Sequence, residues 1–192
     1  MKPIRDIALH CVLLTFIYYV TGTLGLHFAA PPGYATLVWP PAGLAVAALY
    51  LFGPRLWPGV LIGSYLVNLW VPTQIGRPTH AFLSILPALG ATIQALAGAK
   101  ILHEIAARVP FRKAGAMRSI VEHVAVYLPA AFLIGAVNGL LGPTFLLLAG
   151  ALPRETIGAT YFNWCIGDAL GVLVFTPAML AISRLYNTRN FA

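Results

Sequence analysis

The sequence predicts an all-α membrane protein, a bundle of about six transmembrane helices in one domain over residues 1–192. Of the 192 residues, 59% are hydrophobic and only 9% are charged, whereas a soluble domain carries about 25% charged residues. So few charges do not cover a water-facing surface, and the apolar excess must therefore face lipid. The apolar stretches are also long and continuous, which favours helices over barrel strands, whose hydrophobicity alternates residue by residue.

The first two apolar stretches differ in length. The first predicts a helix over about residues 7–28, long enough to cross the hydrocarbon core. The second predicts a helix over about 35–52, which Pro40-Pro41 interrupts. About twelve residues follow the prolines, or roughly 18 Å of helix, which is about half a bilayer. We therefore expect a broken second helix, with Pro41 in the first turn of its inner half.

The remaining helices follow from the other apolar stretches. A tight turn at Gly53-Pro54-Arg55 leads to the third helix, and the second and third are expected to form a hairpin. The third to sixth helices are expected over about 56–71, 79–105, 119–140 and 157–185. Residues 142–152 form a further apolar stretch that is either re-entrant or an extension of the fifth helix, and the sequence leaves both open.

Basic residues are distributed unequally between the two sides of this six-helix topology. Of the twelve lysines and arginines, only Arg77 and Arg154 fall on one side. The others fall on the opposite side: Lys2, Arg5, Arg55, Lys100, Arg108, Arg112, Lys113, Arg118, Arg184 and Arg189. Because cytoplasmic loops carry the excess of basic residues, both termini are expected in the cytoplasm. The same rule explains the net charge of +7, so we expect no binding to nucleic acid.

Asp168 is the sharpest candidate for a functional residue. It lies well inside the sixth predicted helix, where a charged side chain costs on the order of 2.5–3.5 kcal/mol. Such a residue normally faces the bundle interior and has a partner. Asp168 therefore either binds a ligand or ion, or accepts hydrogen bonds that lock the fold.

Several other polar or aromatic side chains are expected at a similar depth, in the outer half of the membrane. They are Tyr34, Trp39, Asn68, Asn138, Asn163 and Trp164, with His27 at the outer end of the first helix. Helix breaks at membrane depth are tolerated where they line a cavity. Together with Asp168, these residues predict a ligand pocket open to the outside. Gln94 is expected deeper, in the inner half of the fourth helix.

Signatures of catalysis and of metal or cofactor binding are absent from the sequence. There is no GxSxG, Walker or HExxH motif, and no close pair of carboxylates. The five histidines lack metal-ligand spacing and suit interfacial packing better. We therefore expect no enzyme activity, no metal and no cofactor in this chain.

Two runs of residues resemble a known family, the membrane-associated sensor domain of the first class (the MASE family). One is Val38-Trp39-Pro40-Pro41-Ala42-Gly43-Leu44-Ala45, followed by Gly53-Pro54-Arg55-Leu56-Trp57-Pro58-Gly59. The other is Trp164-Cys165-Ile166-Gly167-Asp168-Ala169-Leu170-Gly171, closing with Thr176-Pro177. The resemblance extends over about residues 20–183. It implies a sensory input domain in the inner membrane of bacteria, preceding a cytoplasmic histidine kinase or diguanylate cyclase.

Three functions remain open on these grounds. The leading one is a sensory module that binds a small ligand or a membrane partner and passes a helix displacement to a cytoplasmic output domain through its last helix. The alternative is a transporter, or the membrane substrate-binding component of one, because a broken helix beside a buried carboxylate also suits a solute pathway. The third is a structural bundle without a ligand. A homodimer in the lipid bilayer is compatible with each.

Overall fold

The computed structural model describes residues 4–28, 36–74, 81–108, 117–148, 150, 152 and 154–190. Within these residues the chain forms six α-helices, which confirms the predicted all-α class. They are α1 (Ile4–Leu26), α2 (Pro40–Phe52), α3 (Trp57–Gln74), α4 (Ala81–Arg108), α5 (Met117–Leu148) and α6 (Ile157–Asn190). Two short 3₁₀ turns, η1 (Pro54–Leu56) and η2 (Arg154–Thr156), precede α3 and α6.

Four helices of the described chain are long and apolar enough to cross a membrane. Their apolar spans are Arg5–Leu26, Phe82–Arg108, Glu122–Leu148 and Arg154–Tyr186, in α1, α4, α5 and α6. α2 is also apolar but has only 13 residues, or about 20 Å of helix. It is therefore too short to cross the hydrocarbon core by itself.

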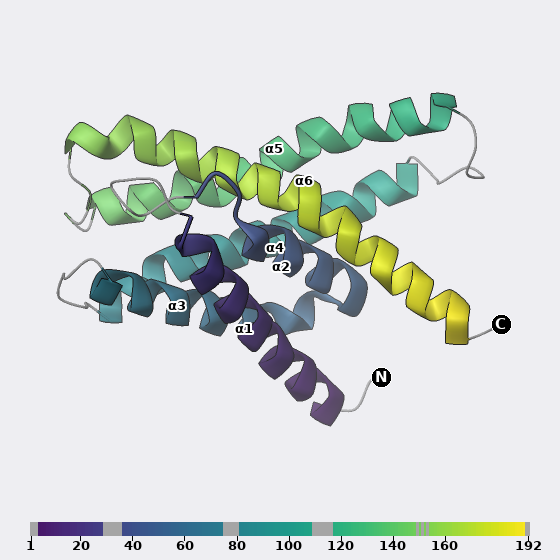
Figure 1. Cartoon of the computed structure of the whole chain (residues 1–192), viewed down its shortest axis with the longest axis horizontal. Coiled ribbons are helices and arrows are strands. Elements are labelled where there is room, and N and C mark those ends of the chain that lie inside the picture. Colours follow the sequence, from purple (N-terminus) through teal and green to yellow (C-terminus); the bar gives the residue numbers. More distant parts are fainter. Residues whose placement is uncertain are drawn as a thin grey trace.

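The helices form three layers of two (Figure 1). α1 and α3 form one outer layer, α5 and α6 form the other, and α2 and α4 lie between them. α2 is enclosed by α1, α4 and α6, and every residue from Pro41 to Leu49 is buried. Alanines and a glycine fill much of this stretch, so neighbouring helices approach α2 closely. The short helix is therefore the centre of the bundle.

α2 begins at Pro40, which corrects the predicted start near residue 35 and the break inside a longer helix. Residues 36–39 are not helical, and Trp39 has φ −111° and ψ 88°. A residue before a proline is disfavoured in the α conformation, and both prolines lack the N–H that would continue a helix backwards. The prolines do occupy the first turn of α2, as predicted.

The predicted hairpin of the second and third helices does not form. Gly53 adopts φ +104°, a left-handed conformation that favours glycine, and its N–H bonds to Leu49 O at 3.0 Å. After this turn, α3 packs against α1 and α4 instead of against α2. The reason is that α2 already lies inside the bundle, enclosed by other helices.

α5 is one continuous helix through Gly142 and Pro143 to Leu148. Its predicted end at residue 140 was therefore too early, and residues 142–148 extend the helix instead of forming a re-entrant segment. Pro143 is buried, and prolines are tolerated within membrane helices where neighbouring helices cover the freed backbone groups.

Candidate functional site

Asp168 is the centre of a buried polar site where α4, α5 and α6 meet. Its side chain is 3% exposed, and Asn138 of α5 donates a hydrogen bond from Nδ2 to Asp168 Oδ2 at 3.0 Å. Gln94 of α4 lies beside the same carboxylate, but its Nε2 is buried and has no partner in hydrogen-bonding geometry. The Arg108–Glu104 ion pair lies elsewhere, at the end of α4. A carboxylate without a basic partner is thus held between two amides.

The polar contacts continue into α1, α3 and the segment before α2. Tyr18 of α1 is buried, and its hydroxyl lies beside Ser64 of α3 and the Trp39 indole, within electrostatic range of Asp168. Asn68 extends the network by donating from Nδ2 to Ser64 O at 2.8 Å. Each helix, or the segment leading into it, therefore contributes to one group of side chains. We call this group the polar cluster: Tyr18, Trp39, Ser64, Gln94, Asn138 and Asp168.

The backbone before α2 crosses α6 directly beside Asp168. Trp39 N donates a hydrogen bond to Gly167 O at 2.8 Å. A Cβ atom on Gly167 would overlap Thr36 O, and one on Gly171 would overlap Trp39 O. Glycine is therefore needed at both positions, because only a bare backbone permits this approach. The crossing holds Trp39 in place within the polar cluster.

Thr176 fixes α6 to the start of α2 at a second point. Its Oγ1 donates a hydrogen bond to Gly43 O at 3.0 Å, and both residues are buried. Two hydrogen bonds, Trp39–Gly167 and Thr176–Gly43, thus join residues 36–43 to the middle of α6. They lie on either side of Gly171, where the two backbones cross most closely. A displacement of one of these segments would therefore be carried to the other.

Trp164 lies one helical turn before Asp168 and on the same side of α6. Its ring packs over Gly142 of α5, where a Cβ atom would overlap it, and its Nε1 is buried without a partner. Asn138 Oδ1 is also unpartnered, and a Cβ on Gly90 would lie 2.5 Å from it. With Gln94 Nε2, three buried polar atoms of the site lack hydrogen bonds. Each such atom costs about 1–3 kcal/mol, so the site favours a small polar guest that would satisfy them.

The structure brings together some of the eight predicted site residues and separates others. Asp168, Asn138 and Trp39 meet at the site, and Asn68 reaches it through Ser64. Trp164 lies one helical turn from Asp168, against Gly142. Gln94 and Asn138 are only 2% and 5% exposed, so the described residues of the site form a buried polar centre. The expected opening of this site to the outside stays a prediction.

The other predicted site residues are elsewhere or not described. Asn163 is half-buried on α6, about 140° around the helix axis from Asp168. His27 is exposed at the end of α1; its Nδ1 lies 2.8 Å from Thr23 O, and its ring contacts Trp70 at 6.0 Å between centroids. Tyr34 lies outside the described residues.

Three members of the polar cluster were not predicted as site residues. Gln94 was expected deeper in the membrane, yet the structure places it beside Asp168. A single amide within a long apolar helix is a signal that could have identified it. Tyr18 and Ser64 carry no such signal, because tyrosine and serine are common in membrane helices.

No three His, Cys, Asp or Glu side chains lie together as a metal site in the described part of the chain. The histidines with ring contacts pack against aromatic neighbours: His10 against Phe52, and His103 against Tyr50. The side chains placed at Asp168 are the amides of Asn138 and Gln94, which are hydrogen-bonding groups.

Comparison with known proteins identifies the family of this chain. The MASE1 family model matches residues 10–192, which include every member of the polar cluster and confirm the resemblance seen in the sequence. No curated protein and no solved structure matches the chain. The chain therefore belongs to the MASE1 family and is a multi-pass membrane sensory domain of the kind found in signalling proteins.

Proposed function

We propose that the polar cluster receives the signal in this sensory domain, by binding a small ligand or responding to a membrane partner. The observation that carries this proposal is the polar cluster itself. Asn138 and Gln94 lie at the buried Asp168 carboxylate, and Tyr18, with Ser64 and Trp39 at its hydroxyl, brings the other three helices or their preceding segments into the same cluster. A bound molecule there would contact every layer of the bundle. It would therefore shift the equilibrium between two helix packings, provided that it binds one of them better.

The unpartnered atoms around Asp168 support a small, polar ligand. Gln94 Nε2 and Trp164 Nε1 are donors without acceptors, and Asn138 Oδ1 is an acceptor without a donor. A ligand with both acceptor and donor groups would satisfy them and gain the hydrogen bonds that they lack. Because Asp168, Asn138 and Gln94 are buried, a ligand that reaches them would displace the helices, and such a displacement is what a sensor needs.

The last helix is the natural route for the signal. α6 carries Asp168 and makes the glycine crossing with the start of α2, and it continues to Asn190. A shift at Asp168 would therefore move the end of α6. We propose that this movement acts on a cytoplasmic output module, a histidine kinase or diguanylate cyclase in the full-length protein.

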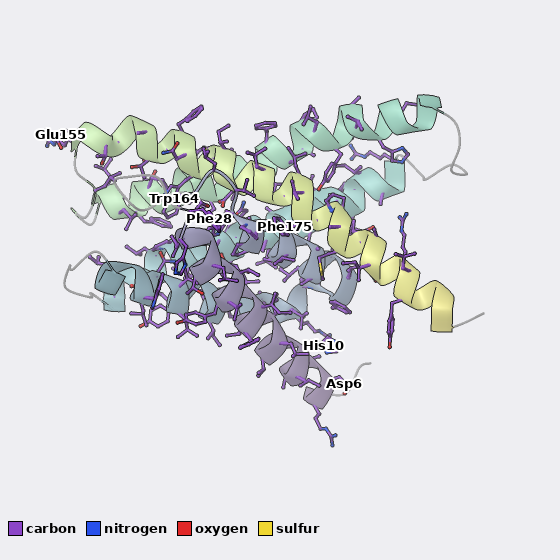
Figure 2. The ribbon with its side chains drawn as sticks, in the orientation of Figure 1. Asp6, His10, Phe28, Glu155, Trp164 and Phe175 are labelled. Atoms are coloured by element: carbon purple, nitrogen blue, oxygen red, sulfur yellow. The ribbon has the colours of Figure 1, made fainter. Side chains whose placement is uncertain are left out.

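The position of the basic residues supports cytoplasmic ends. Figure 1 shows four helix ends towards one end of the molecule: the start of α1, the end of α4, the start of α5 and the end of α6. In Figure 2, Asp6 and His10 of α1 lie at this end, and Glu155 lies at the opposite end. The former end carries Arg5, Lys100, Arg108, Arg118, Arg184 and Arg189. On the positive-inside rule, that end faces the cytoplasm of the bacterial inner membrane.

A transport function is the second candidate, and α2 is the feature that favours it. A helix that begins within the bundle, beside a buried carboxylate, is also found in transporter binding sites. Uptake of a labelled solute by proteoliposomes that contain only this chain would support transport. The MASE1 match supports the sensory function.

A fused reporter tests the sensory proposal. The chain is joined to a kinase or cyclase output, and reporter activity is compared across growth conditions in which the wild-type fusion responds. Asp168→Asn removes the charge but keeps the shape of the side chain, and Trp39→Ala removes the indole beside Tyr18. Each is expected to abolish the response while the protein still reaches the membrane at wild-type levels.

Asp6→Asn is the matched control, because Asp6 is exposed in the first turn of α1. This substitution also removes one negative charge, but at the start of α1, away from the polar cluster. It should leave the reporter response intact. Mass spectrometry of small molecules retained by the purified wild-type chain and by Asp168→Asn gives a direct second measurement. Wild-type signalling by both site variants would show that the polar cluster is structural only.

A further inference from the structure

A groove lies between α4 and α5, away from the polar cluster and close to the end of α4. It has a volume of about 630 Å³ and is lined by Lys100, Ile101, Glu104, Ile105 and Arg108 of α4 and by Val126 of α5. This part of α4 lies towards the same end of the molecule as the start of α1 (Figure 1). The groove is therefore placed where a membrane helix meets the lipid headgroups.

The charges in the groove leave one cation uncompensated. Arg108 Nη2 and Glu104 Oε2 form an ion pair at 3.2 Å on the surface of α4. Lys100 lies one turn before Glu104, and it takes no part in an ion pair within the described residues. A lysine ammonium on its flexible stem is a suitable donor to a phosphate group.

The rest of the lining is apolar. Ile101 and Ile105 of α4 and Val126 of α5 form the other part of the groove. Val126 is itself exposed (37%), as expected of a side chain in contact with lipid. A cation beside an apolar wall at this depth fits a molecule that has a negative headgroup and an apolar chain.

We propose that this groove binds an anionic phospholipid, with Lys100 at the headgroup phosphate and the acyl chain against Ile101, Ile105 and Val126. The proposal does not depend on the function of the polar cluster. Basic pockets between membrane helices are suited to anionic headgroups. The apolar part of the groove selects a lipid over free phosphate, because free phosphate would gain nothing from that surface.

Native mass spectrometry of the full chain tests the proposal. The protein is equilibrated with equal amounts of phosphatidylglycerol, which is anionic, and phosphatidylethanolamine, which is zwitterionic, and the retained lipids are counted. The wild type should retain phosphatidylglycerol preferentially. One basic residue near an anionic surface changes affinity by roughly five-fold, so Lys100→Gln should weaken phosphatidylglycerol binding by about that factor.

Two further variants separate a specific site from general attraction. Arg55→Gln removes one charge from the exposed turn between α2 and α3, outside the groove, and should leave retention unchanged. Val126→Trp fills the groove without changing its charge and should reduce retention as Lys100→Gln does. Equal loss in Lys100→Gln and Arg55→Gln, equal retention of both lipids, or full displacement of the lipid by millimolar inorganic phosphate would each overturn the proposal.

Discussion

The α1–α3 pair and the α5–α6 pair form the two outer layers of the bundle, and glycines bring the helices of each pair together. In the α1–α3 pair, Gly59 meets the Cys11 backbone and Gly63 meets Tyr18. In the α5–α6 pair, Gly135 meets Ala169 and Gly139 meets Cys165. Such contacts allow close packing where lipid provides no hydrophobic drive between helices. The two pairs therefore use the same means of association.

The pairs differ in the polar bonds between their helices. Thr15 Oγ1 bonds to Gly59 O at 3.1 Å across the α1–α3 contact, which joins two neutral groups. The α5–α6 contact instead holds the Asn138–Asp168 bond, with unpartnered atoms nearby. The strength of a hydrogen bond to a carboxylate changes when another group binds the same carboxylate. We infer that glycine packing positions both pairs, whereas the α5–α6 pair holds the carboxylate that a guest would bind.

Gly135→Ala should break the α5–α6 contact and have the largest effect. Its new Cβ would lie 2.5 Å from Ala169 N and 2.8 Å from Ala169 Cα, and a helix backbone does not yield locally. We expect the free energy of unfolding to fall by about 2–3 kcal/mol, measured by titration with sodium dodecyl sulfate in mixed micelles.

Gly158→Ala is the matched control for Gly135→Ala. A Cβ at Gly158, in the first turn of α6, would meet nothing within 4 Å. Replacing a helical glycine in open space should be neutral or stabilise by up to about 1 kcal/mol. Equal stability of the two variants would mean that α5 and α6 lie further apart than the structure shows.

Asn138→Leu should have an intermediate effect and sharpen the difference between the pairs. It removes the bond to Asp168 Oδ2 at similar side-chain volume and leaves the carboxylate with one donor fewer. We expect a loss of about 1–2 kcal/mol in the same titration. In an Asp168→Asn background the loss should be smaller, because the bond to the charged group is already gone. Strictly additive losses would show that Asn138 does not act through Asp168.

The class of fold and the centre of the site could be predicted from the sequence. A low content of charged residues implies lipid-facing helices, and the cost of an intramembrane carboxylate singles out Asp168. Asn138 was predicted because threading the helices across the bilayer places it at the depth of Asp168. Depth is therefore accessible from the sequence for Asn138 and Asp168, whereas Gln94 of α4 was placed too deep.

The rotation of the helices could not be predicted in the same way. Helices in this chain are apolar on the faces towards lipid and towards protein alike; Leu133 is exposed, for example, whereas Ile134 beside it is fully buried. Periodicity therefore does not show which face is inside. For this reason Asn163 was expected at the site and faces elsewhere, and Tyr18 and Ser64 were missed. The burial of α2 was also hidden, because a short apolar helix suits several positions in a bundle.

Thr15→Val tests the α1–α3 side of the comparison and should have the smallest effect. It removes the hydrogen bond to Gly59 O and keeps a β-branched side chain of similar size. Neutral bonds between membrane helices contribute on average about 0.6 kcal/mol, so we expect a loss of about 0.5 kcal/mol and an unchanged reporter response. Thr23→Val is the control, because Thr23 Oγ1 bonds only within α1, to Tyr19 O and Val20 O. A loss at Thr15 as large as that of Asn138→Leu, or a lost response, would mean that the Thr15 bond does more than join α1 to α3.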